Sequence, residues 1–68
     1  MTLANMLLYC RGVVLVAPAH PCLPSLPAGT HVQVIKKDNE YTVIDAEGVR
    51  IGMARALAAR IIVIKQIT

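Results

Sequence analysis

Hydrophobic and polar residues alternate in the middle of the chain, and this alternation predicts a meander of three strands. Val32 and Val34, for example, share one face of the first strand, while His31 and Gln33 occupy the other. A period of two residues is typical of a half-buried β-strand. We therefore expect three antiparallel strands, over residues 30–36, 41–45 and 49–53.

Polar residues separate these three strands and predict tight turns. The residues between the first and second strands are Lys-Asp-Asn-Glu, a polar turn. Asp45-Ala46-Glu47-Gly48 follows the second strand and predicts a type I turn, in which Asp45 opens and caps the hairpin and Gly48 supplies the positive φ. The alternation and the turn residues thus indicate the same hairpins.

The outer parts of the chain are apolar without a clear period. Residues 6–16 contain a run of β-branched side chains and predict a strand that is central or covered on both faces. A helix over residues 3–9 is the alternative, because that piece lacks branched residues. Residues 61–67 predict a last strand of low charge, which either closes a barrel or forms an interface.

Residues 53–60, MARALAAR, predict a short helix before this last strand. Eight residues form only about two turns, which do not hold together in isolation. We expect Leu57 to pin this helix to the core. Its alanines, with Arg55 and Arg60 at their border, are an alternative contact face for a partner.

A proline-rich segment, residues 18–29, joins the first two strands. Its four prolines, which are all the prolines in the chain, recur every three residues at 18, 21, 24 and 27. This spacing matches the polyproline II period and predicts a stiff, extended loop. We expect the loop to lie inside one domain that covers residues 1–68.

The apolar N-terminal run raises the question of a targeting or membrane segment. Arg11 and Gly12 divide the run, and no positive residues precede it, unlike in a secretory signal. Residues 3–17 are also fewer than the roughly 20 that span a bilayer. We therefore expect a cytoplasmic protein with no membrane partner, and its small size is typical of bacterial, phage or plasmid-encoded proteins.

The composition predicts apolar surface that the chain cannot bury by itself. Hydrophobic residues make up 56% of the 68 residues and charged residues only 16%, against roughly 25% charged in typical domains. A domain of this size buries only about 60% of the surface of its unfolded chain. We expect a second copy, as a homodimer, or another protein chain to cover the remainder.

The net charge of +3 is modest, and Lys36 and Lys37 are the only adjacent basic pair. Nucleic-acid-binding domains usually cluster Lys and Arg in one stripe. A solvated basic face is therefore the simpler interpretation, and a phosphate-binding surface the alternative.

The residues that could bind a metal are Cys10, Cys22, His20 and His31. The paired spacings of zinc sites are absent, and a nucleophilic cysteine would also need an orienting group and a pocket. We expect two reduced thiols, no metal, no cofactor and no catalytic residue. A disulfide between Cys10 and Cys22 is the alternative.

The order of elements resembles the SH3-like barrel, and residues 12–66 are similar to bacterial SH3-type (SH3b) domains. The resemblance rests on Gly29, Tyr41, Gly48 and Gly52, placed around alternating Val and Ile. It implies a mostly β fold, a small SH3-like barrel of about five antiparallel strands with a short helical turn before the last strand. The chain has no Trp or Phe, so the aromatic groove that binds proline-rich ligands is not implied.

These observations predict a non-enzymatic binding, adaptor or regulatory module that works through protein-protein contacts. The alternative is a nucleic-acid or ribonucleoprotein accessory protein with basic loops; high salt would weaken phosphate binding but not an apolar interface. The candidate binding residues are Lys36, Lys37, Tyr41, Arg50, Arg55, Leu57 and Arg60.

Overall fold

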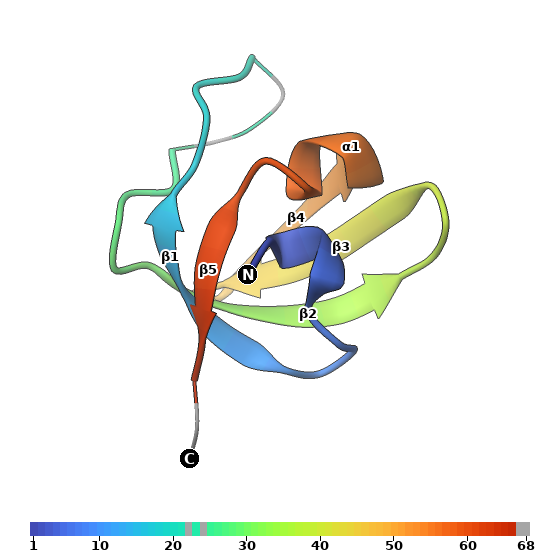
Figure 1. Cartoon of the computed structure of the whole chain (residues 1–68), viewed down its shortest axis with the longest axis horizontal. Coiled ribbons are helices and arrows are strands. Elements are labelled where there is room, and N and C mark those ends of the chain that lie inside the picture. Colours follow the sequence, from blue (N-terminus) through green and yellow to red (C-terminus); the bar gives the residue numbers. More distant parts are fainter. Residues whose placement is uncertain (22, 24, 67–68) are drawn as a thin grey trace.

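The computed structural model describes residues 1–21, 23 and 25–66 of the chain. Figure 1 shows a short 3-10 helix at the N-terminus, five strands and one short α-helix. In chain order these elements are η1 (Leu3–Asn5), β1 (Arg11–Val16), β2 (His31–Lys37), β3 (Tyr41–Ala46), β4 (Val49–Ala54), α1 (Arg55–Ala58) and β5 (Ile62–Lys65).

The five strands form one antiparallel sheet in the order β4-β3-β2-β1-β5. The predicted meander is confirmed, with Val32 and Val34 buried and His31 exposed. β1 is central, as expected, because it pairs with both β2 and β5. The outer side chains of β1 are not covered within this chain, since Leu15 and Val16 are exposed.

Two irregularities let this small sheet curl around its core. The register shifts between Val14 and Val16 in the β1–β5 pair, and between Val34 and Lys36 in the β2–β3 pair. An extra residue in one strand bends it and increases its twist. Figure 1 shows the result, with β1 and β5 running across the direction of β3 and β4.

The N-terminal ten residues differ from both interpretations of the sequence. The strand begins only at Arg11, and the helix is limited to the three residues of η1. Between them the chain reverses at Leu7 to Cys10, where the Cys10 N–H donates to the Leu7 carbonyl at 3.1 Å. An apolar run without a period could not reveal this turn.

Backbone hydrogen bonds join this N-terminal segment to β5. The Leu3 N–H donates to the Ile61 carbonyl and the Val63 N–H to the Met1 carbonyl, both at 2.8 Å. Thr2 forms an isolated antiparallel bridge with Ile62. The outer edge of β5 is therefore partly paired by residues far away in sequence, which reduces the exposed strand edge.

The core contains residues from every element. The largest fully buried side chains are Leu3, Met6, Ile44, Ile61, Val14, Val34, Val63 and Thr42. Leu57 is also buried, as predicted, and it fixes α1. The helix is shorter than expected, because Met53 and Ala54 continue β4 and α1 starts at Arg55. The described residues form no helix long and apolar enough to cross a membrane.

The proline-rich segment packs against the core through Leu23 and Leu26, which are both buried. Its C-terminal part is tied to β1, since the Gly29 N–H donates to the Val14 carbonyl at 2.8 Å. Cys22, for which a reduced thiol is expected, lies outside the described residues. Cys10 is half-buried and carries a free thiol.

The hairpin between β3 and β4 has a different turn from the predicted type I. Ala46 pairs with Val49, and both residues between them have positive φ, 53° at Glu47 and 92° at Gly48. Two residues in this region define a type I′ turn, whose twist matches the strands. Asp45 caps the hairpin as predicted, because its Oδ1 accepts from the Gly48 N–H at 2.7 Å.

Replacing Glu47 by asparagine should raise the free energy of unfolding by about 0.5–1 kcal/mol, because asparagine tolerates the left-handed region better than glutamate. Chemical denaturation of both proteins measures the difference. Glu47→Gln is the matched control, since it removes the same charge without the left-handed preference. A gain of equal size in both variants would contradict the backbone explanation.

Candidate functional site

An open apolar groove of about 460 Å³ lies beside α1. Its lining residues come from the start of β3, the end of β4, α1 and the residue Arg60 after it, and from His20 of the proline-rich segment. We call it the Tyr41–Leu57 groove. Its lining residues are His20, Tyr41, Gly52, Met53, Ala54, Ala56, Leu57 and Arg60.

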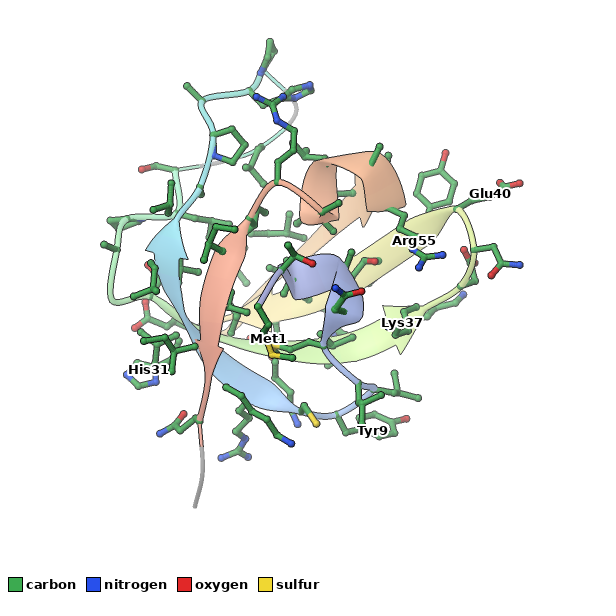
Figure 2. All side chains as sticks on the ribbon, in the orientation of Figure 1. Met1, Tyr9, His31, Lys37, Glu40 and Arg55 are labelled. Carbon is green, nitrogen blue, oxygen red and sulfur yellow. The ribbon has the colours of Figure 1, made fainter. Side chains whose placement is uncertain are left out.

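The turn from β4 into α1 shapes one wall of the groove. The Arg55 N–H donates to the Glu40 carbonyl at 2.8 Å, which fixes the start of the helix to the β2–β3 turn. Leu57 and Ala58 then point into the core, whereas Ala56 and Arg60 are exposed. Figure 2 shows the Arg55 and Glu40 side chains in the region of the β2–β3 turn.

The β2–β3 turn positions Tyr41, which also lines the groove. The Asp38 carboxylate accepts hydrogen bonds from the backbone N–H groups of Tyr41 and Glu40, both at 2.7 Å. These bonds, that of Tyr41 first, hold the pKa of Asp38 below its ordinary value. The Tyr41 side chain is 58% exposed and lines the groove.

The lining determines what the groove can bind. Most of the lining surface is apolar, and the lining residues with polar side chains are Tyr41, His20 and Arg60. None of the described lining residues carries a carboxylate. The groove therefore suits an apolar segment that carries a negative charge next to its apolar part.

Three of the seven predicted binding residues, Tyr41, Leu57 and Arg60, come together in this groove. Leu57 does so from a buried position, so it supports the floor of the groove. Two alanines of residues 53–60, which the sequence offers as an alternative contact face, also line the groove as Ala54 and Ala56. Sequence reasoning missed His20, Gly52 and Met53, because they carry no shared motif.

Several of the basic candidates engage or face other groups of the chain. The Lys37 ammonium donates to the carbonyls of Ala4 and Met6, at 3.1 and 2.9 Å, and so holds the N-terminal segment. Arg50 lies opposite Asp45 in the β3–β4 register, and the charge of Lys36 contributes to the lowered pKa of Asp38. Arg55 is exposed on α1.

The described residues offer no constellation for metal binding. They contain no group of three or more His, Cys, Asp or Glu side chains that could hold an ion. The four acidic residues lie in or next to the two hairpin turns, where Asp38 and Asp45 accept backbone hydrogen bonds. We take the Tyr41–Leu57 groove as the candidate site.

The chain matches no family model, and no curated protein matches its sequence. Two solved structures resemble it closely in fold. The solution structure of FeoA from Chlorobium tepidum superposes with a TM-score of 0.80 at 21% identity, over 93% of this chain and 68% of that one. The crystal structure of an iron uptake regulatory protein, also FeoA, gives 0.79 at 22% identity, over 96% and 94%.

These matches show the fold. The predicted class is confirmed: a mostly β, SH3-like fold of five antiparallel strands with a short helix before the last strand. The two matched proteins are FeoA proteins, so the narrower similarity to SH3b domains stays a prediction.

Proposed function

We propose that this chain is a non-enzymatic regulatory module of iron uptake, which works by binding a segment of another protein in the Tyr41–Leu57 groove. The groove carries the proposal, because it is the apolar hollow where three of the predicted contact residues, Tyr41, Leu57 and Arg60, meet. The likeness in fold to a protein described as an iron uptake regulatory protein supports the assignment of this role to iron uptake.

The shape and charge of the groove favour a protein segment as the ligand. An aliphatic side chain would contact Met53, Ala56 and Leu57, and a nearby carboxylate would pair with Arg60. Apolar contact supplies most of the affinity at such sites, and the charged pair fixes the orientation. No catalytic step is part of this role.

The positions of the basic residues favour this role over nucleic-acid binding. A phosphate-binding face needs several free cations in one stripe. Lys37 is engaged by two carbonyls within the chain, and Lys36 and Arg50 each lie near an aspartate. Binding of a partner protein should accordingly persist at high salt.

The structure also leaves apolar surface outside the groove, in line with the prediction of a homodimer or a protein complex. Self-association stays a prediction, and light scattering at low and high salt would measure it. Among the described residues, the exposed large apolar side chains include Leu7, Leu8, Tyr9, Leu15, Val16, Val49 and Ile64.

Replacing Ala56 by glutamate should abolish partner binding and alter iron uptake by severalfold, because it places a carboxylate on the wall of the groove. The measurement is accumulation of radioactive iron in cells of the source species that express only the variant. Ala56 is exposed, so the fold should be retained.

The matched control is Ala59→Glu. Ala59 is exposed, lies at the other end of α1 and does not line the groove. We expect iron accumulation like that of the natural protein. Equal accumulation in both variants and the natural protein would refute the role of the groove.

A further inference from the structure

The turn before β1 presents three consecutive large apolar side chains to solvent. Leu7 is 66% exposed, Leu8 45% and Tyr9 66%. Figure 2 shows Tyr9 at the periphery of the molecule, away from Glu40 and Arg55. We call residues 7–9 the Leu7–Tyr9 turn. A contiguous apolar tip of this kind on a small domain marks a contact surface.

This turn is held firmly, although its side chains are exposed. The Tyr9 N–H donates to the Val34 carbonyl at 2.7 Å, and the Val34 N–H donates to the Cys10 carbonyl at 3.1 Å. The Gln33 side-chain amide donates to the Tyr9 carbonyl at 3.1 Å. The neighbouring carbonyls of Ala4 and Met6 accept from Lys37. The tip is therefore anchored to β2.

The backbone of Tyr9 is strained. Its φ is 66°, in the left-handed region, and the Cys10–Leu7 hydrogen bond closes a turn with Tyr9 at the third position. A turn of this type favours glycine or asparagine there. A bulky aromatic residue in such a conformation costs stability without contributing to the core, which indicates that its side chain serves a contact.

A cationic hollow of about 220 Å³ adjoins the turn. It is lined by Tyr9, Cys10, Arg11, Lys65 and Gln66. Among the described residues, none that lines this hollow carries a carboxylate. Arg11 also borders a second hollow that contains Asp45 and Glu47, whereas Lys65 does not. The hollow next to the apolar tip can therefore accept an anion.

We propose that the Leu7–Tyr9 turn docks on the surface of a bilayer that contains anionic phospholipid. Leu7 and Leu8 enter the boundary of the acyl chains, Tyr9 lies at the level of the headgroups, and a lipid phosphate sits between Arg11 and Lys65. Apolar and cationic groups side by side match the order of acyl chain and phosphate at such a surface.

This docking departs from the expectation of no membrane partner, which rested on the lack of a segment that could span a bilayer, because the contact is peripheral. A second copy of this chain fits the Leu7–Tyr9 turn and its cationic hollow less well than an anionic bilayer does. If the turn of one chain entered the Tyr41–Leu57 groove of another, Arg11 and Lys65 would approach Arg60, and like charges would oppose the contact. The anionic bilayer is the complementary surface.

The test is co-sedimentation of the purified chain with sucrose-loaded vesicles of equal parts phosphatidylcholine and phosphatidylglycerol. We expect binding at millimolar lipid, weaker by at least about fivefold on phosphatidylcholine alone or at high salt. Leu7→Ser combined with Leu8→Ser should reduce binding roughly tenfold. Lys65→Gln should also reduce it, whereas Lys36→Gln should not.

Two further variants separate binding from folding. Tyr9→Gly should unfold at the same or a higher denaturant concentration, yet bind vesicles about threefold more weakly. Because the chain has no tryptophan, Leu8→Trp provides a single fluorescent reporter whose emission should shift to the blue with anionic vesicles. Val49→Trp, at an exposed position outside the turn and its hollow, should not shift.

Binding that is unchanged by the serine substitutions, equal on both lipid compositions, or absent from anionic vesicles would overturn the proposal. A protein contact would then be the better interpretation of the turn. These outcomes are independent of the groove, since none of the variants used here changes a residue that lines it.

Discussion

Leu3→Ala is expected to lower the free energy of unfolding by about 3 kcal/mol, although Leu3 lies at the third position of the chain. Its side chain is fully buried, and η1 packs against α1. For a domain of this size the total stability is roughly 3–10 kcal/mol, so the loss would leave little of it. Chemical denaturation followed by circular dichroism measures the change.

Leu7→Ala is the matched control for this substitution. It removes the same atoms from the same segment, but Leu7 is 66% exposed. We expect a change within about 0.5 kcal/mol. Similar losses at both positions would contradict the placement of Leu3 in the core, and a loss below about 1 kcal/mol at Leu3 would mean that the N-terminal segment adds little.

Gly12→Val is expected to destabilise the fold by about 3 kcal/mol or more, because β1 and β5 meet at this glycine. A Cβ atom on Gly12 would lie 2.9 Å from the Ile64 carbonyl oxygen and 3.0 Å from the Met6 sulfur. The methionine can move, but the carbonyl belongs to the paired strand. β5 would have to shift away from β1, which disturbs the pairing of Gly12 with Lys65.

Gly52→Ala tests whether the effect arises from this close approach. Gly52 is also a strand glycine, but its nearest neighbour would be a Val43 methyl at 3.8 Å, an ordinary contact. We expect stability to be unchanged or raised by up to about 1 kcal/mol, since alanine restricts the unfolded chain. Equal destabilisation at both glycines would refute the steric explanation. The measurement is the same denaturation experiment.

The sequence was informative where side chains alternate and where turn residues have specific chemistry. The alternation predicted that Val32 and Val34 form the inward face of β2, and both are buried. The turn residues predicted that Asp45 caps its hairpin, and it accepts the Gly48 N–H. The sequence was uninformative in the first ten residues, where an apolar run has no period. The turn in this segment could not be predicted, because its left-handed position is occupied by Tyr9, where glycine or asparagine is usual.

The candidate site was only partly predictable, for a related reason. Tyr41, Leu57 and Arg60 were expected to bind, but their meeting with His20 and the small residues of β4 depends on contacts between distant segments. Lys37 illustrates the converse. Beside Lys36 it resembled part of a basic surface, yet its ammonium is bound to two carbonyls of the N-terminal segment.

The sequence by itself determined the mostly β class, the meander and the short helix before the last strand, because periodicity and turn chemistry are local properties. The tertiary structure decided the pairing of the N-terminal segment with β5, the groove beside α1, and the exposed turn at residues 7–9. Each of these depends on which distant backbone groups find hydrogen-bond partners, and on which apolar side chains the small core has no room to bury.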